Sequence, residues 1–298
     1  MDAVKTPSSP DLGKYAFARA LRPFSFPVAL VTCLVGLILG GLQGSVNIAE
    51  ALLVLVGGVL LQAGVNLIND HADIAQLRRQ PDSMRLIAAV QLNFRAGLLC
   101  FLLAAAIGFH FVLQQGAGFL WLCVLGLAGA LGYTVSPVNY KSRGLGVVLV
   151  FWLMGVLMIA GSAVAVGGAL TFALLLQTVP VSVLVSLLLL SNELRDYESD
   201  AQEGLKTLTV RLGYARGVSL YFALLAFAYG LLPVLLWLGL LPGALWVLPS
   251  LLMAFKPVRL LRAPAERRAP LTPATARLLL VFGLLYCVAL LAPRALPL

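Results

Sequence analysis

The sequence contains few charged residues. Only 11% of the 298 residues are Asp, Glu, Lys or Arg, whereas a soluble domain averages about 25%. Hydrophobic residues make up 61%, and long apolar runs recur from Phe24 to Leu291. This composition leaves room for little soluble structure and predicts one integral-membrane domain over residues 1–298, with residues 1–20 as a polar N-terminal tail. The tail lacks the short apolar core and cleavage site of a signal peptide, so we expect no cleaved leader.

Cysteine and histidine are also scarce. The sequence has two His residues and four Cys residues, and no C-x-x-C pair occurs. The cysteines lie singly in apolar runs at Cys33, Cys100, Cys123 and Cys287. We expect them to be small core residues rather than zinc ligands.

The apolar runs predict an all-α multi-pass membrane bundle of about nine transmembrane helices. Most runs approach the ~20 residues that one bilayer crossing needs. The eighth run is the weakest candidate, because it is short and contains Pro242 and Pro249. The approximate limits are 25–43, 49–69, 96–113, 117–134, 145–166, 170–191, 217–238, 240–255 and 278–293.

The basic residues predict the orientation of this bundle. Every Lys and Arg except Arg294 falls in the N-terminal tail or in loops on one side of the predicted spans. The positive-inside rule makes that side cytoplasmic, so the N-terminus is expected in the cytoplasm. A basic surface facing the lipid bilayer explains the net charge of +9 without a nucleic-acid partner.

Acidic residues gather in two places, at the ends of the second and sixth predicted spans. The stretches are "NLINDHAD" (66–73) and "NELRDYESD" (192–200). Both read N-x-x-x-D followed by a ring residue, His71 or Tyr197. Because each stretch closes the second helix of a four-span group, the pattern hints at an internal duplication.

Helical spacing predicts that each stretch forms a stripe of oxygen atoms. Residues three or four positions apart are neighbours on a helix. Carboxylate and amide oxygens suit a hard cation, Mg²⁺ or Mn²⁺, and Mg²⁺ often takes one or two carboxylates together with substrate phosphates. We therefore expect both stripes to face one cavity that holds metal ions and a diphosphate, with their carboxylates within roughly 10 Å. The stripes are Asn66, Asn69, Asp70 and Asp73, and Asn192, Asp196 and Asp200.

These two motifs resemble those of the UbiA superfamily of membrane prenyltransferases. The second motif matches the family pattern N-x-x-x-D-x-x-x-D in full. The first matches the family pattern N-D-x-x-D-x-x-x-D at Asn69, Asp70 and Asp73, but Leu77 stands at the place of its last Asp. The stretches "ALRPFSFPVAL" (20–30) and "GYTVSPVNYKSRGLG" (132–146) are similar to the start of the first helix and to the loop after the fourth in that family. The stretch "NELRDYESDAQEGLKTLTVRLG" (192–213) looks most like the branch that prenylates 1,4-dihydroxy-2-naphthoate for menaquinone.

The resemblance implies Mg²⁺-dependent transfer of an isoprenyl chain from a polyprenyl diphosphate to an aromatic acceptor. It implies a bacterial inner membrane with the active site facing the cytoplasm. Asp70, Asp73, Asp196 and Asp200 are the implied catalytic residues, and they share the metal with Asn66, Asn69 and Asn192. The candidates for diphosphate binding are Arg78, Lys141, Arg143 and Lys206, and those for facing the allylic cation are Tyr133, Tyr197 and His71.

Alternatives stay open at this point. Leu77 and a short segment between the second and third spans depart from the family pattern, and that segment would form part of a lid. The acceptor alternatives are 4-hydroxybenzoate, a tocopherol-type precursor, chlorophyllide and haem. A non-catalytic lipid- or quinone-binding relative and a transporter are further alternatives. A transporter site would lie near the middle of the bilayer rather than at the helix ends.

Overall fold

The computed structural model describes residues 13, 15–79, 83–134 and 140–293, and these residues form helices and turns without a strand. The first half contains α1 (Phe17–Ala20), η1 (Pro23–Ser25), α2 (Phe26–Gly41), α3 (Ile48–Asn69), η2 (Asp70–Asp73), α4 (Ile74–Leu77), α5 (Met84–Gln115), α6 (Ala117–Thr134) and η3 (Tyr140–Arg143). The second half contains α7 (Gly146–Val150), the π-helical η4 (Phe151–Leu157), α8 (Met158–Ala165), α9 (Phe172–Arg195), α10 (Tyr197–Gln202), α11 (Leu208–Leu212), α12 (Tyr214–Trp237), η5 (Ala244–Ala254), α13 (Phe255–Leu261), η6 (Ala265–Arg267) and α14 (Leu271–Leu290).

The chain is a multi-pass membrane protein. In its described part, eight helices are long and apolar enough to cross a bilayer. The remaining predicted span, 117–134, corresponds to α6, whose described apolar part, Ala117–Gly129, is shorter. Nine crossings and a cytoplasmic N-terminus therefore stay predictions. Large apolar side chains such as Trp237 (84% exposed) and Phe172 (75% exposed) point outward, where lipid would surround them.

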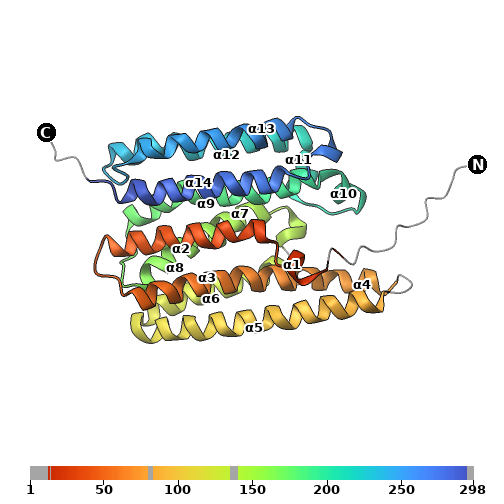
Figure 1. The fold of residues 1–298 in the computed structure, drawn as a ribbon, viewed down its shortest axis with the longest axis horizontal. Helices are drawn as coiled ribbons and strands as arrows, with labels where there is room; N and C mark the ends of the chain where they lie inside the picture. Colours follow the sequence, from red (N-terminus) through yellow and green to blue (C-terminus); the bar gives the residue numbers. More distant parts are fainter. Residues whose placement is uncertain (1–12, 14, 80–82, 135–139, 294–298) are drawn as a thin grey trace, which may run out of the picture.

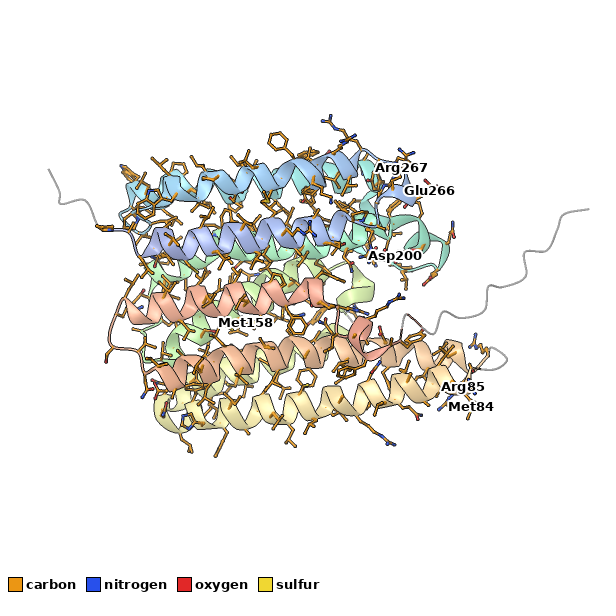
Figure 2. The ribbon with its side chains drawn as sticks, viewed as in Figure 1. Met84, Arg85, Met158, Asp200, Glu266 and Arg267 are labelled. Carbon is orange, nitrogen blue, oxygen red and sulfur yellow. The ribbon has the colours of Figure 1, made fainter. Side chains whose placement is uncertain are left out.

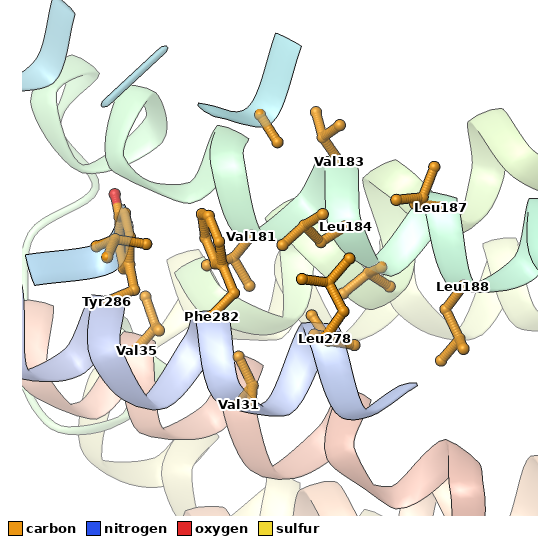
Figure 3. Packing of buried hydrophobic residues seen from close by; sticks show 14 of the residues in the cluster. Val31, Val35, Val181, Val183, Leu184, Leu187, Leu188, Leu278, Phe282 and Tyr286 are labelled. Atoms are coloured by element: carbon orange, nitrogen blue, oxygen red, sulfur yellow. The ribbon is translucent and has the colours of Figure 1, made fainter. Parts of the chain in front are cut away.

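The long helices run side by side in layers (Figure 1). In that view α12 and α13 lie above α14 and α9, and α5 lies below α3 and α6. The centre is formed by α2, α9 and α14, which pack against one another. Figure 3 shows Val31, Val181, Leu278 and Phe282 meeting there, all of them fully buried.

Two helices begin earlier than the hydropathy predicted. The third predicted span begins at residue 96, but α5 begins at Met84; the ninth begins at 278, but α14 begins at Leu271. The first turns of α5 are amphipathic, and they bury Leu86 and Val90 against residues before α2 and after α3. A hydropathy window ends at polar residues, whereas a helix continues wherever one face is packed.

Neither acidic motif is one uninterrupted α-helix, contrary to the spacing argument. The α-helix α3 ends at Asn69 and continues as the 3₁₀-helix η2. In the second motif α9 ends at Arg195 and α10 begins at Tyr197, with Asp196 (φ −94°, ψ 7°) between them. A 3₁₀-helix has three residues per turn rather than 3.6, so side chains beyond Asn69 do not continue the α-helical stripe.

Both motifs lie at the same end of the bundle. The short helices α1, α4, α10 and α11 gather at that end in Figure 1. Figure 2 places Asp200, Glu266 and Arg267 there as well. The bundle thus brings the two motifs together at its end rather than at its middle.

Candidate active site

A cleft of about 410 Å³ lies between the two acidic motifs. Its described lining residues are Arg19, Arg22, Phe24, Asn69, Asp70, Asn192, Arg195 and Asp196. One carboxylate and one amide come from each motif, as the matching patterns predict. Three arginines and an aromatic ring complete the wall, so the cleft is rich in positive charge.

Arg22 connects the first motif to the turn before α2. Its Nη2 lies 2.7 Å from Oδ1 of Asp70, a residue that is only 4% exposed. When the Asn69 amide is turned so that its oxygen faces Arg22, that oxygen accepts hydrogen bonds of 2.8 and 2.7 Å from Nη1 and Nη2. Arg22 has φ +50°, in the left-handed region. This backbone costs a non-glycine residue free energy, so surrounding contacts must hold the turn.

Buried amides on α3 supply those contacts. Asn66 donates from Nδ2 to the carbonyl of Leu21 and to Oγ of Ser25, both at 2.7 Å. Gln62, one turn earlier, donates to the same Ser25 hydroxyl at 3.1 Å and to Oδ1 of Asn66 at 3.3 Å. Asn66 therefore positions the turn that carries Arg22 and does not itself line the described part of the cleft. Its metal-binding role stays a prediction.

The second motif places a carboxylate on the opposite wall. Asp196 accepts two hydrogen bonds from Arg195, from Nε at 2.7 Å and from Nη2 at 2.5 Å. Asn192 lies one turn earlier on α9, and its Oδ1 is 3.5 Å from the hydroxyl of Thr272 on α14. The same hydroxyl accepts from Nη1 of Arg195 at 3.3 Å. The last helix, α14, thus contacts the second motif through Thr272, which is not among the described lining residues of the cleft.

The structure places several other predicted residues away from the described lining of the cleft. Asp200 lies in α10, where its backbone N–H donates to the carbonyl of Asp196. The Tyr197 ring packs edge-on against Tyr214, with centroids 5.5 Å apart. The His71 ring lies 4.2 Å from that of Phe94. Three basic candidates, Arg78, Arg143 and Lys206, are exposed. The side chains of Asp73, Tyr133 and Lys141 fall outside the described residues. All these roles stay predictions.

Four residues of the cleft were not assigned to the site from the sequence: Arg19, Arg22, Phe24 and Arg195. The arginines were counted as basic residues at helix ends, and Arg22 and Arg195 also lie in stretches that resemble the family, but none was given a role in the site. One signal was present, because Gln62 extends the polar stripe of Asn66 by one further turn into an apolar helix. A buried amide deep in a span needs a polar partner, and that partner is the turn carrying Arg22.

The donor set fits a magnesium ion that arrives with phosphate. The cleft offers the carboxylates of Asp70 and Asp196 and the amides of Asn69 and Asn192. Among the described residues, no group of three or more His, Cys, Asp or Glu side chains is placed to hold a metal. Mg²⁺ commonly binds one or two carboxylates plus substrate phosphates rather than an all-protein cage. The three guanidiniums match phosphate oxygens by charge and shape.

Comparisons with known proteins agree with this arrangement. Residues 29–282 match the UbiA prenyltransferase family. The chain is 33% identical over 212 residues to a 1,4-dihydroxy-2-naphthoate octaprenyltransferase of Escherichia coli (strain K12), covering 66% of this chain and 68% of the relative. It is 33% identical over 252 residues to the enzyme of the same name from Mycobacterium leprae (strain TN), covering 80% and 83%.

A solved structure has the same fold. It is that of a UbiA homolog from Archaeoglobus fulgidus bound to GPP and Mg²⁺, with a TM-score of 0.62. The match covers 91% of this chain and 99% of that one at 17% identity. At that identity the likeness concerns the fold alone.

Proposed function

Because the chain belongs to the UbiA prenyltransferase family and is a membrane-embedded aromatic prenyltransferase, we propose that it transfers an isoprenyl chain from a polyprenyl diphosphate to 1,4-dihydroxy-2-naphthoate, a step of menaquinone biosynthesis. The observation that carries this proposal is the single cleft where Asp70 and Asp196 meet three arginines. The names of the two 33%-identical relatives support this acceptor.

The arginines explain how the cleft receives a diphosphate. Arg22 is paired with Asp70, and Arg195 with Asp196. A diphosphate carries more negative charge than a carboxylate, so it competes for these guanidiniums. As the arginines turn to phosphate oxygens, the carboxylates become available as ligands. Asp70 and Asp196, with the amide oxygens of Asn69 and Asn192, would then hold Mg²⁺.

The chain's own groups then assist bond cleavage. The allylic C–O bond breaks with its electron pair leaving on the diphosphate, and a ring carbon of the acceptor attacks the allylic carbon. That ring carbon then loses the group it carried, either a proton to solvent or its carboxylate as carbon dioxide, and the aromatic ring is restored. Arg19, Arg22 and Arg195 stabilise the negative charge that develops on the leaving oxygen. When bound, Mg²⁺ would add further neutralisation of that charge. The Phe24 ring on the wall of the cleft offers a π face to the allylic cation.

The acceptor is tested by direct competition. Purified protein in lipid vesicles is given one polyprenyl diphosphate, Mg²⁺ and an equimolar mixture of 1,4-dihydroxy-2-naphthoate and 4-hydroxybenzoate. We expect the prenylated naphthoate to dominate the products. Prenylation of 4-hydroxybenzoate alone would overturn the acceptor while leaving the diphosphate site intact. Repeating the assay with diphosphates of increasing chain length defines the preferred tail.

We further propose that the protein resides in a bacterial inner membrane with the cleft facing the cytoplasm. The concentration of basic residues on that side of the spans supports this orientation. Lys206 is exposed near the second motif, so Lys206→Cys is a suitable reporter. A membrane-impermeant maleimide should label it in inverted vesicles and not in intact cells. Labelling in intact cells would show that the cleft faces the opposite side of the membrane.

A further inference from the structure

The segment that leads into the last helix contacts the second acidic motif on both sides of Asp196. Thr272, in the first turn of α14, reaches Arg195 and Asn192, and Arg268 reaches Glu198. We propose that Arg268 and Thr272, here called the α14 platform, are positioning residues that fix the second motif for Mg²⁺–diphosphate binding. The inference rests on the proposed function of the cleft as a diphosphate site, and it adds two residues that touch neither substrate nor metal.

The Thr272 hydroxyl contacts one hydrogen-bond donor and one hydrogen-bond acceptor of the second motif. Its side chain is buried (1% exposed). Its oxygen accepts from Nη1 of Arg195 at 3.3 Å and donates to Oδ1 of Asn192 at 3.5 Å. A hydroxyl both donates and accepts, so one atom fixes the arginine that holds Asp196 and the amide one turn before it. A valine of the same shape supplies neither bond.

Arg268 fixes the other side of the motif. It is 7% exposed, and its Nη1 donates to Oε1 of Glu198 at 2.7 Å while Nε donates to the carbonyl of Ala263 at 2.9 Å. The guanidinium carbon lies 3.9 Å from the ring centroid of Tyr214, so the group also stacks on α12. A lysine has no planar fork with which to make these three contacts together. Arg268 therefore ties α10 to α12 and to the segment before α14.

The break at Asp196 explains why such support matters. The α-helix stops at Arg195 and resumes at Tyr197, so the direction of the Asp196 carboxylate depends on how α10 is held against α9. Thr272 anchors the last turn of α9, and Arg268 anchors the first turn of α10. The three contacts that they make with the motif join residues 70, 77 and 80 positions apart in the sequence. Local helix formation alone does not supply this constraint.

The test compares two buried threonines of the same helix. Thr272→Val removes a hydroxyl that touches the motif, whereas Thr275→Val removes one that bonds Tyr221 at 3.0 Å, away from it. Binding of inorganic diphosphate in the presence of Mn²⁺ is measured by calorimetry on the detergent-purified protein. We expect Thr272→Val to bind at least about 10-fold more weakly, as is usual when a residue supporting a metal ligand is lost. Thr275→Val should bind like the wild type, and Thr272→Ser should restore binding.

Steady-state kinetics separate positioning from general loss of stability. In Thr272→Val and Arg268→Lys, the Mg²⁺ concentration for half-maximal rate and the KM for the polyprenyl diphosphate should rise about 10-fold, while the KM for the aromatic acceptor stays unchanged. Arg267→Gln, an exposed neighbour, should change none of these values. If Thr272→Val does not accumulate, Glu198→Gln is used, because it removes the ion-pair partner of Arg268 at a side chain that is 40% exposed. It should raise the same two values, and unchanged values would count against the platform.

Two outcomes overturn the inference in distinguishable ways. If the wild type binds diphosphate and the Thr272 and Arg268 variants bind it equally well, the platform has no positioning role and the proposed function stands. If the wild type itself shows no metal-dependent diphosphate binding, the proposed function of the cleft fails and the inference fails with it.

Discussion

Arg22 and Asp70 form an ion pair of 2.7 Å although 48 positions separate them in the sequence. The pair connects the turn before α2 to the end of α3 and places a guanidinium on a carboxylate expected to bind metal. Arg195 pairs with Asp196 in the same way on the opposite wall. These two carboxylates are thus each paired with an arginine, and a diphosphate, which carries more negative charge, competes for both guanidiniums.

Metal binding should depend on diphosphate. In the wild type, Mn²⁺ competes with Arg22 and Arg195 for the two carboxylates, so we expect its affinity to rise at least about 10-fold when inorganic diphosphate is added. Arg195→Gln removes one competitor. It should bind Mn²⁺ more tightly than the wild type without diphosphate and should bind diphosphate more weakly. Electron paramagnetic resonance of free and bound Mn²⁺ measures both. An affinity unchanged by diphosphate in the wild type would contradict this exchange.

Arg22→Gln should impair use of the diphosphate. A hydrogen bond to a charged group contributes about 1.5–3 kcal/mol, so kcat/KM for the polyprenyl diphosphate should fall about 10- to 100-fold. Arg22→Lys keeps the charge but loses the fork that spans Asp70 and Asn69. Its kcat/KM should lie between those of the wild type and Arg22→Gln. Arg259→Gln, an exposed arginine on α13, is the matched control. Equal rates for Arg22→Gln and Arg259→Gln would remove Arg22 from the site.

A separate prediction concerns the packing of α2 against α8. A Cβ added at Gly36 would lie 2.6 Å from Cβ of Ser162 and would also clash with the carbonyl of Ile159. Gly36→Ala should therefore lower the free energy of unfolding by about 1–3 kcal/mol. Gly230, inside α12, has nothing within 4 Å of an added Cβ. Gly230→Ala should be neutral or should stabilise by up to about 1 kcal/mol. Thermal unfolding in one detergent compares the stabilities of the two variants. A Gly36→Ala protein as stable as the wild type would show that the close contact between α2 and α8 can widen at little cost in free energy.

Much of the fold was predictable because a bilayer demands apolar segments of a set length. The predicted 49–69 and α3 (Ile48–Asn69) differ by one residue. The early start of α5 was missed because Leu86 and Val90 bury their apolar face on residues such as Tyr15 and Leu77. Tyr15 lies far from both residues in the sequence, and a hydropathy window does not contain a contact of that kind.

The site was predictable in outline and not in its contacts. The matching motifs indicated that Asp70 and Asp196 share one cleft, and they line the same one. Helical spacing alone did not show that the amide nitrogen of Asn66 donates to the backbone carbonyl of Leu21, and its role as a metal ligand stays a prediction. The role of Arg22 depends on a left-handed backbone and a partner 48 positions away. Neither follows from local sequence.

The central claim is that the cleft between the two acidic motifs is the metal-dependent site of prenyl transfer, and Asp196→Asn tests it most directly. Transfer from a polyprenyl diphosphate to 1,4-dihydroxy-2-naphthoate is measured in membranes with saturating Mg²⁺, beside Glu203→Gln, an exposed acid near the same motif. We expect Asp196→Asn to accumulate normally and to lose at least about 100-fold in rate, the size typical of a lost electrostatic stabiliser. Glu203→Gln should keep the wild-type rate, and EDTA should abolish that rate until Mg²⁺ is restored. Near-normal turnover by Asp196→Asn, or indifference of the wild type to EDTA, would contradict the account.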